Sequence, residues 1–346
     1  MKVAIGLGMT GEGDWDVAAT YVQEAEKLGA SHVWSAEAWG TDAVTPLAFM
    51  AAKTSTIMLG AGIMQAVGRT PANTAMTAMT LQALSHGRFI MGLGASGPQV
   101  VEGWHGVPYR KPIRRIREVI EIVRLVSSGQ KLQYDGEIFH LPLPGGEGKA
   151  IRSGAPPLEK PVPVYLATLS PVSLALTGEV ADGWLGTSFI PEQAEAVFFQ
   201  HIRKGAQKAG RSMDEIDLQA GGVVSFTDDL EKALPRRKPG LAFTLGAMGS
   251  KEHNFYNAAF QRAGYEEEAR AIQRKWIEGD RQAAAAMVPD EMVTKTNMLG
   301  TEAQVRERMV AYKAAGVTTL RVDPDGRTLE ERLETLGRAI NIAKDV

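Results

Sequence analysis

The sequence predicts an α/β fold, a (β/α)₈ TIM barrel with insertions at the carboxyl-terminal face of the barrel. Short apolar runs typical of buried strands alternate with longer runs of helical period, and glycine-containing turns follow several of the strands. A chain of 346 residues is long enough for one such barrel with insertions. The eight predicted strands are residues 3–8, 32–36, 58–64, 88–94, 162–167, 183–188, 218–226 and 318–323.

The segment 112–127 shows the helical period most clearly. Its apolar residues fall on one face, and its charged residues fall on the opposite face, which we expect to be solvated. The apolar stripe is Ile113, Ile116, Val119, Ile120 and Val123, and the wet face is Arg114, Arg115, Arg117, Glu118 and Glu121. Eight strand–helix units of this kind favour a closed barrel over an open doubly wound sheet.

One motif argues for the open sheet. Residues 6–11 match the letters GxGxxG of a dinucleotide-binding turn after the first strand. The acidic residue expected about 20 positions later does not follow a clear second-strand end, so the match is weak. Dense glycine usage is equally typical of a barrel rim.

Two connections are too long to be simple barrel loops. Residues 129–160 are rich in glycine and proline and predict a small hairpin that turns at Asp135-Gly136. Residues 227–300 predict a mostly helical insertion, with 266–286 as its clearest helix. Neither segment looks self-contained, so we expect a single domain over residues 1–346 whose insertions form walls over the active site.

Composition excludes several classes of protein. A formal net charge of −2 predicts no affinity for nucleic acid or for an anionic membrane. No apolar run approaches the roughly 20 residues that span a bilayer, and no signal-peptide pattern follows Met1, so we expect a cytoplasmic location. The absence of cysteine and the scattered positions of six histidines predict no metal site and no thiolate nucleophile.

The predicted carboxyl ends of the strands carry few acids, bases or nucleophiles. They are rich in glycine, small hydroxyl residues and apolar residues, which suits the face of a planar cofactor that brings its own reactivity. Residues 168–173 resemble a helix N-terminus with hydroxyl groups, and this pattern fits a phosphate-binding loop or a plain capping loop equally well.

Three stretches together carry a resemblance to a known family. They are AEAWGTD, LGAGIMQAVGRTPANTAMTAMTLQALSHGRFIMGLGASGPQVVEGWHGVPYRKPIRRIREVIEIV and PVYLATLSPVSLALTGEVADGW. The sequence resembles the bacterial luciferase-like superfamily, in particular its coenzyme F420-dependent oxidoreductase branch, over residues 1–191 and 300–346. The resemblance implies a homodimer of TIM barrels that bind F420 at the carboxyl ends of the strands and exchange hydride at C5 of the deazaflavin.

The resemblance also implies positions for the cofactor. A non-prolyl cis peptide that backs the cofactor ring is expected at Gly62-Ile63, and Met64 follows it. The loop from Gly94 is expected to reach the ribityl side through Ser96 and Gln99. The phosphate loop matches Ala167, Thr168, Leu169 and Ser170, but a lysine common in relatives is replaced by Val172.

The catalytic candidates are Glu37, Trp39 and His105. Sugar-phosphate dehydrogenases of this branch place a histidine where this chain has Ala38, which argues against oxidation of glucose 6-phosphate. Glu37 is expected to manage a proton or to hydrogen-bond purely for structure. Trp39 and Trp104 are expected either to form walls of an apolar pocket or only to pack against their neighbours. His105 is expected to be either a proton donor or an incidental loop residue.

The resulting prediction is an F420-dependent oxidoreductase that acts on a small to medium organic substrate such as a ketone, an alcohol or a conjugated alkene. Two alternatives stay open: a monooxygenase of the same superfamily that depends on FMN, and a non-catalytic flavin-binding or assembly subunit. The basic residues between 110 and 117 either meet the glutamate tail of F420 or form a solvated helix face.

Overall fold

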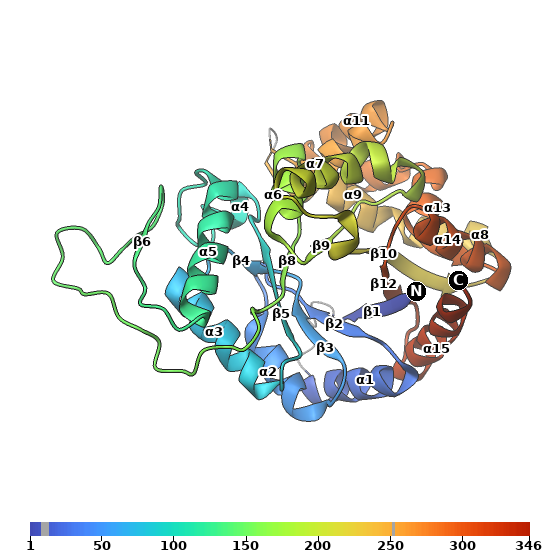
Figure 1. The fold of residues 1–346 in the computed structure, drawn as a ribbon. Helices are drawn as coiled ribbons and strands as arrows, with labels where there is room; N and C mark the ends of the chain where they lie inside the picture. The colour runs from blue at the N-terminus through green and yellow to red at the C-terminus, as the bar shows by residue number, and fades with distance from the viewer. Residues whose placement is uncertain (8–13, 251–252) are drawn as a thin grey trace.

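A closed barrel of parallel strands forms the centre of the molecule in the computed structural model, which describes residues 1–7, 14–250 and 253–346. The strand order is β12-β1-β2-β3-β5-β8-β9-β10, and pairing of β10 with β12 closes the barrel (Figure 1). The strands are β1 (Lys2–Gly6), β2 (His32–Ser35), β3 (Met58–Ala61), β5 (Phe89–Gly94), β8 (Val164–Leu166), β9 (Gly183–Leu185), β10 (Asp217–Phe226) and β12 (Thr319–Pro324). The predicted TIM barrel is therefore confirmed, and the open sheet is wrong.

Helices cover the outside of the barrel and alternate with its strands (Figure 1). Polar side chains cap several of them: Asp14, for example, accepts hydrogen bonds from the N–H groups of Asp16 and Val17 at the start of α1. The covering helices are α1 (Trp15–Leu28), α2 (Val44–Lys53), α3 (Pro71–Leu84), α5 (Pro112–Ser127), α6 (Pro171–Val180), α7 (Gln200–Lys208), α14 (Glu302–Ala314) and α15 (Leu329–Asp345). The GxGxxG match at 6–11 falls mostly outside the described residues.

Helix α5 has the predicted bounds, and the structure corrects one residue of its predicted wet face. Glu118 is completely buried, because residues 137–139 cover its carboxylate. These residues belong to the segment 129–160, which forms an extended arm beside α5 (Figure 1). The two short strands of this arm, β6 (Tyr134–Asp135) and β7 (His140–Leu141), form the predicted hairpin. The Glu118 carboxylate accepts hydrogen bonds from the N–H groups of Glu137, Ile138 and Phe139 at 2.8, 3.0 and 3.0 Å.

Substitution Glu118→Gln is expected to loosen the arm, because an amide cannot accept all of these bonds. Burial alone would raise the pKa of Glu118, but the three N–H groups and Arg114 outweigh it and hold the pKa below 4.5. The stabilisation is therefore present above pH 4.5 and is lost as the pH falls through the lowered pKa. Limited proteolysis should show faster cleavage within 129–160 in this variant, whereas Glu147→Gln at an exposed arm position should match the parent; equal cleavage of both variants would contradict the prediction.

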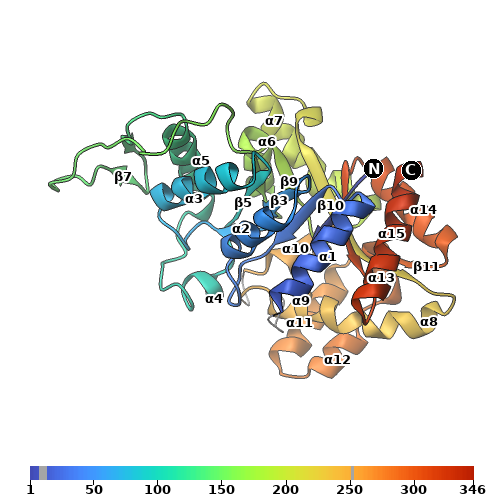
Figure 2. The same ribbon diagram turned by 90° about the horizontal axis from the view of Figure 1, so that it is seen from below.

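Among its described residues, the segment between β10 and α14 contains six α-helices and one short strand. They are α8 (Leu230–Ala233), α9 (Lys238–Ala247), α10 (Phe255–Arg262), α11 (Glu266–Ile277), α12 (Arg281–Ala286), α13 (Asp290–Thr296) and β11 (Met298–Gly300). The single helix predicted over 266–286 is in fact two, because Gly279 adopts a left-handed φ of 89° and Asp280 caps the next helix. Helices α9–α12 gather at one end of the barrel, where α4 (Pro98–Val101) also lies (Figure 2).

The barrel interior is polar at its base and open above it. Asp217 accepts hydrogen bonds from the side chains of Tyr165, Gln219 and Thr319 at 2.9, 2.7 and 2.9 Å. The Trp34 indole lies across the barrel and donates to Gln219, and a Cβ on Gly60 would come within 2.2 Å of its ring. The indole therefore fills the middle of the barrel and leaves the space above it for a ligand.

Candidate active site

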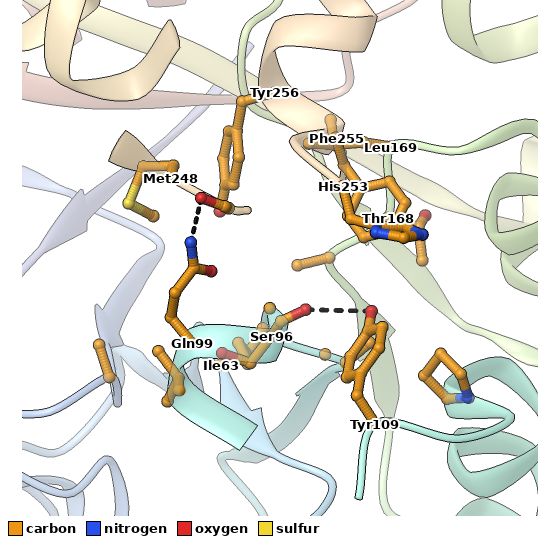
Figure 3. A pocket seen from close by; sticks show the side chains of 18 of the residues that line it. Ile63, Ser96, Gln99, Tyr109, Thr168, Leu169, Met248, His253, Phe255 and Tyr256 are labelled. Atoms are coloured by element: carbon orange, nitrogen blue, oxygen red, sulfur yellow. Dashed lines mark hydrogen bonds between the residues drawn. The ribbon is translucent and has the colours of Figure 1, made fainter. Parts of the chain in front are cut away.

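A cavity of about 790 Å³ opens at the carboxyl ends of β2, β3, β5 and β8. The remaining walls come from the segment 100–109, the starts of α5 and α6, and residues 243–249 and 253–256 of the helical insertion (Figure 3). Its size is within the usual range for pockets that enclose small molecules. Apart from Glu37, the described side chains that line it are apolar, aromatic, hydroxyl or amide groups and one histidine, with no lysine or arginine.

The floor of the cavity is formed by Gly62 and Ile63 beside Gly94. The predicted cis peptide between Gly62 and Ile63 is present. A Cβ on Gly94 would lie 2.7 Å from Cδ1 of Ile63, so only glycine at 94 leaves the isoleucine side chain in its place. Met64, predicted to bind the cofactor, does not line the cavity, because β4 (Met64–Gln65) directs its side chain into the hydrophobic core.

The loop after β5 crosses from the floor to the insertion. Gln99 lines the cavity and donates its amide N–H to the carbonyl oxygen of Gly249, as the dashed line in Figure 3 shows. Tyr109 donates its hydroxyl to the carbonyl oxygen of Ser96 at 3.4 Å, and Ser96 has a left-handed φ of 57°. Both predicted residues of this loop therefore reach the cavity, and Gln99 also ties its two sides together.

The predicted phosphate loop lines the opposite side of the cavity, and its hydroxyl groups are already engaged. The hydroxyl of Thr168 hydrogen-bonds the hydroxyl of Thr177, a residue of α6, at 2.7 Å. Ser170 and Ser173 form a reciprocal capping box at the N-terminus of α6. Ala167 and Leu169 also line the cavity, and Arg262 donates to the Leu169 carbonyl oxygen at 2.7 Å. These contacts favour the capping alternative for this loop, and the guanidinium of Arg262 lies beside it although the loop has no lysine.

Glu37 reaches the cavity wall with both carboxylate oxygens occupied. Arg69 binds it with two hydrogen bonds of 3.1 and 2.9 Å, and the N–H groups of Gln65 and Ala43 donate to it at 3.1 and 3.2 Å. The side chains of Glu37 and Arg69 are only 10% and 17% exposed. This environment favours the structural alternative for Glu37. Arg69 was not predicted from the sequence, although a carboxylate at a strand end calls for a cation nearby.

His105 does not line the cavity. Its Nε2 contacts Oε1 of Gln65, whose amide group donates to the carbonyl oxygens of Glu37 and Ala38. Because that Gln65 oxygen can only accept, Nε2 of His105 must carry the hydrogen. His105 therefore ties the loop after α4 to the end of β2, and its place supports a structural role more than proton donation.

Exposed aromatic side chains surround the cavity entrance. Trp39, Trp104 and Phe243 are 49%, 66% and 39% exposed and come from three separate segments. The insertion and its neighbours supply further lining residues that were not predicted from the sequence, which include Tyr109, Phe243, Met248, His253, Phe255 and Tyr256. Their positions depend on how the insertion packs over the barrel, and no local sequence pattern reports that.

The basic residues between 110 and 117 have mostly found partners within the chain. Lys111 pairs with Glu137, Arg114 with Glu118, and Arg117 with Glu179. Arg115 lies over the ring of Phe139 with 5.3 Å between the guanidinium carbon and the ring centroid. These contacts favour the helix-surface reading over a site for a glutamate tail.

The chemistry of the cavity fits a planar, largely apolar cofactor ring. The floor of Ile63 over Gly94 offers an apolar contact surface, and Ser96 and Gln99 offer polar groups beside it. No group of three or more metal-ligating side chains occurs among the described residues. In the same described part of the chain, no helix is long and apolar enough to cross a membrane.

A family model described as luciferase-like monooxygenase matches residues 2–319. A Mycobacterium tuberculosis protein whose name places it among coenzyme F420-dependent oxidoreductases is 38% identical, over 92% of this chain and 94% of its own. The 5,10-methylenetetrahydromethanopterin reductase of Archaeoglobus fulgidus is 31% identical, over 92% and 93%. The solved F420-dependent tetrahydromethanopterin reductase of Methanopyrus kandleri has a TM-score of 0.81 at 27% identity and covers 97% of each chain.

Proposed function

Because this chain belongs to the luciferase-like monooxygenase family, we propose that it is a coenzyme F420-dependent oxidoreductase. The observation that carries the proposal is the largely apolar cavity that has Ile63 and Gly94 at its floor. When bound, the deazaflavin supplies or accepts a hydride at C5. The proposed substrate is a small to medium ketone, alcohol or conjugated alkene.

The residues of the chain would position the two reactants and exclude water. Ile63 and Gly94 would support the cofactor ring, and Ser96 and Gln99 would hydrogen-bond its side chain. The backbone of the loop at Ala167–Ser170 borders the far end of the cavity. Trp39 and Trp104 give the entrance apolar walls, which favour a substrate with an apolar body.

Proton handling at this site does not use the pattern of sugar-phosphate dehydrogenases. Ala38 stands where those enzymes are expected to place a histidine, and the Glu37 carboxylate is held by Arg69 and two N–H groups. A carboxylate with its oxygens fixed in this way is a poor candidate for proton transfer. We therefore propose that Glu37 positions the end of β2 and that the proton is exchanged elsewhere.

A binding titration tests the proposal. F420 is expected to quench the tryptophan fluorescence of the purified protein tightly and to saturation, because Trp39 and Trp104 are at the cavity entrance. FMN should quench it weakly or not at all. Trp104→Phe should reduce the amplitude of quenching. Tight binding of FMN without binding of F420 would replace this proposal with the FMN-dependent monooxygenase, and binding of neither would favour a non-catalytic subunit.

The homodimer, the cytoplasmic location and the single-domain organisation stay predictions from the sequence. Sedimentation equilibrium of the purified chain tests the first of them directly. A mass of one chain at micromolar concentrations would contradict the expected homodimer.

A further inference from the structure

The side chain of Gln65 joins two segments that border the cavity entrance. Gln65 lies in β4, two residues after Ile63 of the cavity floor, and is buried (Figure 3). Its amide nitrogen donates to the carbonyl oxygens of Glu37 and Ala38 at 3.3 and 2.9 Å. Its Oε1 accepts from Nε2 of His105. The nitrogen and the oxygen of this buried amide are thus both engaged, and each one holds a different segment.

Two exposed tryptophans stand next to the residues that Gln65 binds. Trp39 follows Ala38, and Trp104 precedes His105. Both indoles line the cavity and are exposed, whereas the other four tryptophans of the chain are buried or half-buried. Trp39 and Trp104 therefore form one corner of the cavity entrance, which we call the aromatic corner.

Further contacts fix the two segments relative to each other. On the Trp39 side, Arg69 holds Glu37 with two hydrogen bonds of 3.1 and 2.9 Å. Gly68 packs between the two sides, because a Cβ there would lie 3.3 Å from Oε1 of Glu37 and 3.8 Å from Cε1 of His105. The segments that carry the two indoles are therefore held at a set separation in the absence of any ligand.

An exposed pair of indoles beside a cavity indicates contact with a ligand. Large apolar side chains left in water lose the free energy of burial, and exposed apolar groups around a cavity are typical of binding sites. Indole rings make favourable offset-stacked or edge-to-face contacts with another aromatic ring, which stabilise more than the buried area alone. A saturated ring is puckered and meets a flat indole with fewer of its atoms. The aromatic corner therefore fits a flat, unsaturated ring.

The aromatic corner adjoins the floor on which we propose that the cofactor ring lies. Gln65 follows Ile63 in the same short segment, and it pairs with Gly94 in the register between β4 and β5. A ring that contacts the aromatic corner would therefore lie beside the cofactor ring. This step rests on the proposed function.

We propose that Gln65 is a positioning residue that sets the substrate preference of the cavity. Through Ala38 and His105 it holds Trp39 and Trp104 as a fixed pair, and this pair binds a flat ring of the substrate. The substrate is then a ketone, an alcohol or a conjugated alkene whose reacting carbon belongs to an aromatic or conjugated ring or is attached to one.

Two ketones that differ only in the saturation of one ring test the proposal. Acetophenone carries a flat phenyl ring, and cyclohexyl methyl ketone carries a puckered ring in the same place. The protein is labelled with 5-fluorotryptophan, and Trp39→Phe and Trp104→Phe assign the two fluorine resonances. Acetophenone should shift both resonances and bind about fivefold more tightly than its saturated partner. Equal affinity, including no measurable binding of either ketone, overturns the proposal.

Variants of the two bonded side chains assign the preference to Gln65. Gln65→Met keeps the length of the side chain but can neither donate to Ala38 nor offer an amide oxygen to His105. It should broaden the fluorine resonances of both indoles and reduce the preference for acetophenone to about twofold or less. His105→Leu should broaden the Trp104 resonance alone and reduce the preference in part. If Gln65→Met does not fold, an unchanged preference in His105→Leu overturns the assignment.

Gln82→Met is the matched control for the loss of a glutamine amide. The Gln82 amide donates to the carbonyl oxygen of Phe89 at 2.9 Å, at the amino end of β5 and away from the cavity. This variant should lose stability but prefer acetophenone as the parent does. A preference that survives in Gln65→Met, or one that is lost equally in Gln82→Met, contradicts the role of Gln65.

Titrations with and without F420 separate this proposal from the proposed function. The aromatic corner is formed without a ligand, so the free protein should also prefer acetophenone. Failure of F420 to bind, with the preference intact, would refute the proposed function alone. Fluorine shifts that follow protein concentration instead of ketone concentration would show that a second copy of the chain covers the indoles, and would overturn the proposal.

Discussion

Replacement of Arg69 by methionine is expected to lower the free energy of unfolding by about 3 kcal/mol. The substitution removes both hydrogen bonds from the guanidinium and leaves the nearly buried Glu37 carboxylate with only two N–H donors, from Gln65 and Ala43. An ionised carboxylate without a countercharge in such a place is costly. Chemical denaturation of the parent and the variant at neutral pH, with a shared m-value, measures the difference.

The double variant separates a structural pair from a catalytic acid. Glu37→Gln in the Arg69→Met background should recover part of the lost stability, because the amide carries no charge that needs a partner. If Glu37 acts only in structure, Glu37→Gln alone should keep turnover with any substrate that is found. Loss of turnover in Glu37→Gln with unchanged stability of both single variants would restore the catalytic reading of Glu37.

Gly94→Ala is expected to weaken F420 binding by roughly ten- to a hundredfold. This estimate takes the cost of overpacking the site, about 1–3 kcal/mol, as lost binding free energy. The new Cβ would lie 2.7 Å from Cδ1 and 3.1 Å from Cγ1 of Ile63, so the isoleucine side chain must move away from Gly94. Ile63 forms the floor of the cavity, and its displacement occupies space that the cofactor ring needs. Fluorescence titration with F420 measures the loss.

Gly97→Ala is the matched control within the same loop. Its Cβ would lie 3.7 Å from the nearest atom outside its chain neighbours, Oε1 of Gln99, which is ordinary contact. Its φ of −123° is also open to alanine. F420 affinity should therefore stay close to that of the parent. Equal losses in the two variants would show that the floor at Ile63 does not set the affinity.

The barrel could be predicted from the sequence because its strands are short continuous apolar runs separated by helical segments. All eight predicted strands have a counterpart in the barrel. Helix α5 was predictable to the residue, since Pro112 at its first position and the apolar stripe mark it clearly. The burial of Glu118 was not predictable, because the N–H groups that satisfy it come from an arm about 20 residues later in the chain.

The candidate site was predictable where a strand end supplies it. Gly62, Ile63, Gly94, Ser96 and Gln99 all line the cavity. Met64 and His105 do not, because Met64 packs into the core and His105 contacts Gln65 instead. The wall that includes Phe243 and Tyr256 depends on long-range packing, such as the Trp276 side chain within 2.3 Å of where a Cβ on Gly246 would be.

The reciprocal capping box at the start of α6 has a consequence for the thermodynamics of binding. Without a ligand, Ser170 and Ser173 already hydrogen-bond each other through their backbone N–H and hydroxyl groups. The Thr168 hydroxyl bonds that of Thr177, and the Thr168 carbonyl oxygen accepts from the Trp184 indole. A loop that is already ordered loses little conformational entropy when a ligand arrives. Calorimetry should therefore find that this end of the cavity adds almost no unfavourable entropy to cofactor association, because folding itself has already ordered the loop.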